Sequence, residues 1–245
     1  LLFGQEKHIV FTPHLGASTN EAQENVGIQV AEQLRDFLTT GEIRNAINMP
    51  SLDAGALQQI GPYLDLANSL GKFLAKLGPA NPDSLRISYH GEIAEKDTAL
   101  ISRTALTGYL EAARPEGQVN IVNSPAVAHD MGLELVDSVI NAKTEYSELI
   151  VAELTKDGKK FRVSGTIIGK SPRIVEIDRL FVDTNIKGHF LIVRNDDRPG
   201  IVGLVGSSLG AAGLNIANLS LARNKTAGDA LNVIELDTAP GPEII

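Results

Sequence analysis

Two short segments of the chain carry residues whose types and spacing suit chemistry. In the first, near the amino terminus, His14 stands between Pro13 and Gly16, directly after a short apolar run. Imidazole has an unperturbed pKa of about 6.5, which suits proton transfer near neutral pH. A histidine ahead of a helix can equally serve as a capping or core residue, and local spacing does not exclude that role. His14 is therefore a candidate general acid/base with a structural alternative.

The second segment lies near the carboxyl terminus and suits recognition of a small molecule. An apolar strand pattern runs through Asn195 into Asp197-Arg198-Pro199-Gly200, and a glycine-rich helix pattern leads to Asn215. The Asp197 carboxylate can accept from an α-ammonium group, while the Asn215 amide offers both a donor and an acceptor. Alternatively, Asp197 caps the helix that follows it and Asn215 occupies a turn.

Composition limits the classes of function. The 245 residues are 43% hydrophobic, which is enough for two or three folded units. No run approaches the roughly 18 apolar residues of a membrane span, and the absence of cysteine excludes disulfides and favours the cytoplasm. The net charge of −8, with scattered Lys and Arg, argues against nucleic-acid binding. The histidines show no paired spacing, so we expect no metal site.

Glycine spacing argues against a nucleotide loop in this chain. No two glycines are separated by a single residue, so the G-x-G-x-x-G fingerprint of a dinucleotide-binding domain is absent. Gly165 and Gly169 have three residues between them, whereas a phosphate loop requires four. The glycines between residues 200 and 213 recur at spacings of three and four, which predicts a helix face packed closely on a sheet.

The first elements that must position these residues are two helices. Ser18 or Thr19 can cap a helix that ends at Gly41. Its apolar residues recur at spacings of three and four, at Val26, Val30, Leu34, Phe37 and Leu38. Residues 51–61 then form a turn-rich predicted linker, and the pattern predicts a second helix over 62–77 with Pro62 at its first position.

The middle of the chain predicts a mixed α and β pattern. A strand over 85–89 is followed by a helix that begins at Asp97 or Thr98 and by another that Ser124 caps. From Leu149 the pattern becomes β-rich: Asp157-Gly158 predicts a type I′ hairpin turn, and 174–182 adds more strand. Residues 51–186 are therefore interpreted as one α+β unit.

The last segment predicts a strand, a helix and two strands, over 189–194, 199–212, 215–223 and 230–236. Pro240 and Pro242 would then open a second helix. This order fits a β-α-β-β-α-β ferredoxin-like domain whose final helix and strand are missing from this chain. Residue 1 is not methionine, and both ends of the chain are expected to be cut.

The segment from Pro13 to Thr19, followed by Glu21-Ala22-Gln23, resembles the end of the catalytic region of the D-3-phosphoglycerate dehydrogenases, which are D-2-hydroxyacid dehydrogenases. The resemblance implies that His14 is the general acid/base and that the hydride passes to NAD. It also places Gly16 and Ser18 beside the nicotinamide end of the cofactor. The carboxylate and arginine that assist the histidine in that family belong to a region upstream of this chain.

Residues 188–245 are similar to ACT domains, a resemblance carried by Asn195 to Val202 and by Gly213-Leu214-Asn215-Ile216. In the dehydrogenase version the ligand is L-serine, held where two such domains meet side by side. The resemblance implies that Asn195, Asp197 and Asn215 bind the effector and that the protein is a homo-oligomer. Some family members have a bulkier ring at the position of Asn195.

Residues 51–186 resemble the intervening domain of the long-form enzymes, where an anionic effector can bind. Lys170, Arg173 and Lys187 are the cationic candidates, although lone basic residues on hairpins are usually solvated surface.

The expected architecture is therefore an α/β remnant of the catalytic region over 1–50, an α+β intervening domain over 51–186 and a truncated ferredoxin-like ACT domain over 187–245. The expected function is part of an enzyme that oxidises 3-phosphoglycerate to 3-phosphohydroxypyruvate with NAD, at the start of L-serine synthesis. This portion alone is expected to be inactive. The alternative is a stand-alone amino-acid-binding ACT regulatory protein.

Overall fold

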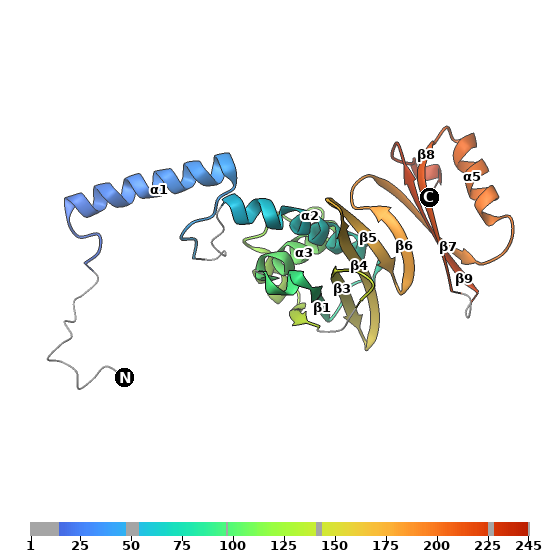
Figure 1. Ribbon diagram of the computed structural model, residues 1–245, viewed down its shortest axis with the longest axis horizontal. Helices are drawn as coiled ribbons and strands as arrows, with labels where there is room; N and C mark the ends of the chain where they lie inside the picture. The colour runs from blue at the N-terminus through green and yellow to red at the C-terminus, as the bar shows by residue number, and fades with distance from the viewer. Residues whose placement is uncertain (1–14, 48–53, 97, 141–143, 225–227, 245) are drawn as a thin grey trace. The chain divides into compact units, whose positions relative to one another are not determined.

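The computed structural model describes residues 15–47, 54–96, 98–140, 144–224 and 228–244 (Figure 1). The chain divides into two units, residues 1–58 and 59–245. Across the described residues, none of the helices combines the length and apolar character that crossing a membrane requires.

The first unit contains helix α1, Asn20–Thr40, whose two ends are as predicted. The Thr19 hydroxyl accepts from the backbone N–H of Ala22 at 3.1 Å, and Gly41 ends the helix at a φ of 76°. The predicted apolar stripe is present, but its side chains are exposed within this chain, Leu38 at 75%. Both ends of the helix therefore follow from local signals, a capping hydroxyl and a glycine.

Helix α2, Ala54–Leu77, begins earlier than predicted and has Pro62 inside it. The predicted linker over 51–61 is therefore wrong from Ala54 onward. Proline lacks one backbone donor but keeps a helical φ, and the preceding Ala, Leu and Gln residues favour helix. Burial of the side chains after Gln59, such as Leu66 and Leu70, holds the helix on the core.

A six-stranded sheet forms the larger part of the second unit, in the order β2-β1-β3-β4-β5-β6. Its strands are β1 Ser84–Gly91, β2 Glu134–Val139, β3 Glu148–Lys156, β4 Lys159–Ile168, β5 Ser171–Ile177 and β6 Leu180–Asn185. The pair of β1 and β2 is parallel, and the other neighbours are antiparallel. Strand β2 was not predicted, because its edge position buries few of its side chains and its apolar pattern is weak.

Helices connect the two parallel strands, as parallel pairing requires. A 3₁₀ turn, Glu92–Glu95, precedes α3, Thr98–Ala113, and α4 follows over Ser124–Asp130. The helix predictions are confirmed, although Asn123 rather than Ser124 occupies the N-cap of α4.

Two tight hairpin turns shape the antiparallel part of the sheet. Asp157 and Gly158 have φ values of 49° and 73°, which confirms the predicted turn between β3 and β4. Asp178 and Arg179 form a similar turn, with φ values of 48° and 67°, and divide the predicted run 174–182 into β5 and β6. That turn has no glycine, so the sequence did not reveal it.

Helices α2 and α3 approach each other through glycine. A Cβ built on Gly71 would lie 2.1 Å from the carbonyl oxygen of Ala105, and one on Gly108 would lie 2.2 Å from that of Asn68. Each glycine therefore accommodates the backbone of the opposite helix, and no larger residue fits at this spacing.

A buried polar chain joins α3 to the sheet. The Ser102 hydroxyl donates to Asp137 of β2, and the Tyr89 hydroxyl of β1 also bonds to Ser102. Burial raises the pKa of Asp137 above its usual value, an effect larger than the lowering by the hydrogen bond from Ser102.

Replacing Asp137 by asparagine is expected to stabilise the fold at neutral pH. Because folding raises the pKa of this carboxyl, its charged form costs stability at pH 7, and that cost disappears when it is protonated at low pH. Asparagine keeps an acceptor for Ser102 and carries no charge. We expect a higher midpoint of thermal unfolding for Asp137→Asn at pH 7, and a difference that shrinks towards pH 4. A lower midpoint for the variant at pH 7 would contradict this account.

A second, three-stranded sheet contains β7 His189–Asp196, β8 Ile216–Asn224 and β9 Asp229–Leu236, in the order β7-β9-β8. Helix α5, Ile201–Ala211, packs on one face through Leu209, which contacts Ile234 and Leu236 (Figure 1). The predicted order of strand, helix, strand and strand is confirmed. Beyond β9, the described residues form a 3₁₀ turn, Pro242–Ile244.

The predicted role of the glycines in α5 is wrong. A Cβ built on Gly203, Gly206 or Gly210 would meet no heavy atom within 4 Å, so the glycine face does not pack on the sheet. The apolar residues Val205 and Leu209 face the core instead. Burial of larger side chains, which gains more free energy, decides which side of the helix faces inward.

Candidate functional site

His14 of the predicted catalytic segment lies outside the described residues, and the structure describes this segment from Leu15 onward. Leu15 to Ser18 form a turn in which both the backbone N–H and the hydroxyl of Ser18 donate to the Leu15 carbonyl, at 3.1 and 2.7 Å. A Cβ on Gly16 would meet nothing within 4 Å, so the backbone there is open. The turn places an accessible backbone directly before the start of α1.

The predicted effector residues Asn195 and Asp197 lie at one end of the three-stranded sheet. Asn195 pairs with Ala230 of β9, and Ala230 pairs with Arg223 of β8. The backbone N–H of Asp197 donates to Gly228 at 2.6 Å, which fixes the loop between β7 and α5. The Asp197 carboxylate lies 3.6 Å from the Arg223 guanidinium.

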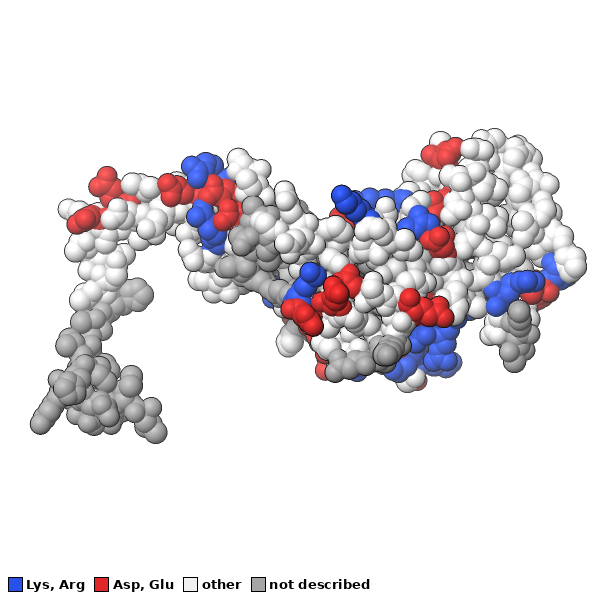
Figure 2. Space-filling model, in the orientation of Figure 1, with Lys and Arg blue, Asp and Glu red and all other residues white. Residues whose placement is uncertain are grey.

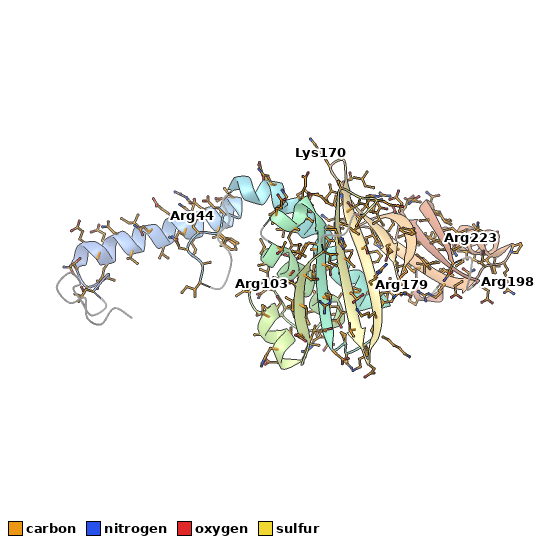
Figure 3. All side chains as sticks on the ribbon, turned by 60° about the horizontal axis from the view of Figure 1, so that its bottom comes forward. Arg44, Arg103, Lys170, Arg179, Arg198 and Arg223 are labelled. Atoms are coloured by element: carbon orange, nitrogen blue, oxygen red, sulfur yellow. The ribbon has the colours of Figure 1, made fainter. Side chains whose placement is uncertain are left out.

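A cavity of about 360 Å³ opens on the α5 side of this end of the sheet. Its polar lining combines a carboxylate, two guanidinium groups and two amides: Asp197, Arg198, Arg223, Asn195 and Asn232. Figure 3 shows Arg198 and Arg223 on this part of the chain. The backbone N–H groups at the start of α5 also favour an anionic group. The cavity therefore offers complementary partners to both charges of a free amino acid.

The third predicted effector residue, Asn215, lies at the opposite end of the same sheet. It directly precedes β8, whose first residue Ile216 pairs with Leu236, and its amide donates to Asp237 at 2.6 Å. Five residues of β9 lie between Ala230 and Leu236, so the two positions are about 20 Å apart along the strand. One copy of the chain therefore does not bring Asn215 to Asp197.

The three predicted anion-binding cations are not brought into one cluster by any described contact. Lys170 lies in the turn between β4 and β5 (Figure 3). Arg173 contacts Asp183 at 2.7 Å, and Lys187 contacts Asp65 at 2.8 Å. Basic and acidic side chains are interspersed on the face shown in Figure 2. An anion site at these residues stays a prediction.

Sequence reasoning missed Glu235, a buried carboxylate that joins the two sheets. It is 8% exposed and accepts from the Thr184 hydroxyl at 2.6 Å, from the Asn185 backbone and amide at 2.9 and 2.6 Å, and from the Asn218 amide at 3.2 Å. Burial by itself raises the pKa of Glu235, but these hydrogen bonds outweigh it and hold the pKa below its usual value. A charged residue directly after the apolar pair Val233-Ile234 and before Leu236 in β9 was the available signal.

His90 of β1 is buried, and its Nδ1 has no hydrogen-bond partner among the described residues. Within the same residues, no three His, Asp or Glu side chains are grouped so that they could hold a metal ion.

Comparison with known proteins gives consistent matches. Residues 59–178 match the D-3-phosphoglycerate dehydrogenase intervening domain. The chain is 32% identical over 241 residues to the D-3-phosphoglycerate dehydrogenase of Archaeoglobus fulgidus, which covers 97% of the chain and 45% of that protein. It is 34% identical over 238 residues to the enzyme of that name from Methanocaldococcus jannaschii, with the same coverage, and 32% identical over 230 residues to that from Bacillus subtilis, with 94% and 44% coverage. The chain thus spans less than half the length of these relatives.

Proposed function

The chain belongs to the D-3-phosphoglycerate dehydrogenase family, and from this premise we propose that it forms the carboxyl-terminal portion of an enzyme of this activity. The complete enzyme oxidises 3-phosphoglycerate to 3-phosphohydroxypyruvate, with NAD as the hydride acceptor, at the first step of L-serine synthesis. The cysteine-free composition supports a cytoplasmic location.

In this proposal His14 holds the proton of the substrate hydroxyl during hydride transfer. The open backbone at Gly16 and the Ser18 turn would border the nicotinamide end of NAD, which supplies the hydride acceptor when bound. Most of the cofactor site, and the groups that orient the histidine, would belong to an upstream domain. The 245 residues alone are therefore expected to be inactive.

The reading frame that contains this chain tests the activity. If upstream sequence encodes a G-x-G-x-x-G fingerprint after a strand, the expressed full-length protein should reduce NAD in the presence of 3-phosphoglycerate. A start codon immediately before Leu1, together with amino-acid binding and no dehydrogenase activity, would instead favour a stand-alone ACT regulator.

We also propose that residues 187–245 form a serine-sensing ACT domain after an intervening domain over 51–186 and a catalytic remnant over 1–50. The β7-β9-β8 order supports a ferredoxin-like arrangement, because β7 is an edge strand to which a fourth strand could add. Asn195 and Asp197, beside the cavity at one end of this sheet, would bind the effector.

The placement of Asp197 and Asn215 at opposite ends of one sheet is the observation that carries this proposal. A two-fold arrangement of two copies presents the same surface from each, so Asp197 of one copy can meet Asn215 of the other. One L-serine molecule would then contact both copies. Binding lowers activity only to the extent that serine prefers the inactive arrangement. The hydrogen bonds from Thr184 and Asn185 of β6 to Glu235 of β9 form the Glu235 joint between the two sheets. Through this contact the three-stranded sheet would act on the six-stranded sheet.

Mixing two variants tests whether the serine site is shared. Asp197→Ala and Asn215→Ala should each weaken L-serine binding at least tenfold, the order expected for a lost charged or amide hydrogen bond. A mixed dimer of the two variants contains one site with both natural residues and one that lacks both. After dissociation and random reassociation, we therefore expect about a quarter of the wild-type binding capacity to return.

Isothermal titration of the separate and mixed variants measures this capacity. If the site is built within one copy, mixing the variants would restore no L-serine binding capacity. Undiminished L-serine binding by Asp197→Ala would show that Asp197 is not part of the site. Arg194→Ala, on β7 outside the cavity, is the matched control and should bind L-serine normally.

A further inference from the structure

The cavity beside Asp197 has a buried floor that the predicted effector residues do not explain. Asn232 of β9 lines the cavity and is only 2% exposed. Its side-chain oxygen Oδ1 is buried and has no hydrogen-bond partner among the described residues. A buried amide oxygen without a donor costs free energy, and because Asn232 lines this cavity, a ligand bound there is the group that can supply the donor.

Neighbouring hydrogen bonds fix the orientation of this amide. Asn195 uses its own Nδ2 to donate to the Asp196 carbonyl at 2.6 Å, which leaves its Oδ1 facing Asn232. Because that oxygen can only accept, Asn232 must present its nitrogen, and the two atoms lie 2.8 Å apart. The Asn232 oxygen is therefore held away from Asn195, as an acceptor.

Charged groups of the cavity lie nearer to solvent than this floor. The side chains of Arg223 and Asp197 are 53% and 34% exposed and belong to the rim. Removing a charge from water costs far more than removing a hydroxyl, so the ammonium and carboxylate of an amino acid are best placed at the rim. The neutral side chain of the ligand then points to the floor.

We infer that Asn232 selects the effector by accepting a hydrogen bond from its side-chain hydroxyl, with Asp197 and Arg223 holding the ammonium and carboxylate. This inference rests on the proposed serine sensor and adds the residue that distinguishes L-serine from L-alanine. A site built to bond a hydroxyl rejects the ligand without one, because its own buried polar group stays unpaired. Some family members have a ring side chain at the position of Asn195. An asparagine at this position fits the role inferred for Asn232, because its amide oxygen accepts from the Asn232 amide and holds it in place.

Titration of L-serine and L-alanine against the chain and its variants provides the test. Wild type should bind L-serine about tenfold or more tightly than L-alanine, the ratio expected for one buried hydrogen bond. Asn232→Leu should remove this preference by weakening L-serine binding while leaving L-alanine binding equal or stronger. Should that variant fail to unfold cooperatively, Asn232→Ala measures the same ratio.

Variants at the rim separate selectivity from affinity. Arg223→Gln should weaken both ligands by a similar factor and keep their ratio, whereas Arg194→Gln, outside the cavity, should change neither. An unchanged serine-to-alanine ratio in the Asn232 variants would overturn this inference and leave the shared sensor intact. Failure of wild type to bind either amino acid would overturn both.

Discussion

Alanine at Gly108 or Gly71 is expected to destabilise the second unit by about 3 kcal/mol or more, at the upper end of the usual cost of overpacking a core. The added methyl group would meet a backbone carbonyl oxygen of the opposite helix, at 2.2 Å for Gly108 and 2.1 Å for Gly71. A flexible side chain could rotate away from such a contact, but a helix backbone cannot. The helices α2 and α3 would have to separate and lose packing around both contacts.

Denaturant unfolding measures this loss as a fall in the midpoint concentration. Gly206→Ala in α5 is the matched control, because its new methyl group would meet no atom within 4 Å. Alanine favours a helix over glycine by about 1 kcal/mol, so this control should be slightly stabilised. Stabilisation by Gly108→Ala as well would show that α2 and α3 are not in close contact.

Replacement of Glu235 by leucine is expected to cost about 3 kcal/mol at pH 7, similar to breaking a buried ion pair. The variant removes the shared acceptor of Thr184, Asn185 and Asn218 and leaves their donors beside an apolar group. Glu235→Gln keeps the shape and one acceptor oxygen, so its cost should be smaller. Glu134→Gln, at an exposed position of β2, should change stability little.

The dependence on pH gives a second test of the same joint. Folding lowers the pKa of Glu235, so its stabilising contribution is complete above its unfolded value of about 4.5 and is lost as the pH falls through the lower folded value. The difference in unfolding free energy between wild type and Glu235→Gln should therefore shrink below pH 4.5. A difference that grows on acidification would contradict the hydrogen-bonded carboxylate.

If the joint couples the two sheets, Glu235→Gln should also alter the response to serine. In the full-length enzyme we expect L-serine to bind with little change in affinity but to inhibit less. Normal inhibition would assign Glu235 a role in stability alone.

The sequence by itself determined the elements whose signals are local. Thr19 and Gly41 define the ends of α1, and Asp157-Gly158 defines a hairpin, because a capping hydroxyl and positive φ values are properties of a few neighbouring residues. The family resemblance was also carried by short motifs, such as the segment around Asp197. These features need no knowledge of distant residues.

Only the tertiary structure decided what depends on contacts between distant residues. Pro62 suggested a helix start, but α2 begins at Ala54, and the part of it after Gln59 is held by burial of Leu66 and Leu70. The glycine face of α5 turns away from the sheet because Leu209 faces inward. Sheet order separates Asn215 from Asp197 and joins Glu235 to β6, and strand pairing places Asn232 beneath the cavity. Such contacts form because they bury apolar area over the whole unit. No short stretch of sequence shows which distant residues will share that buried area.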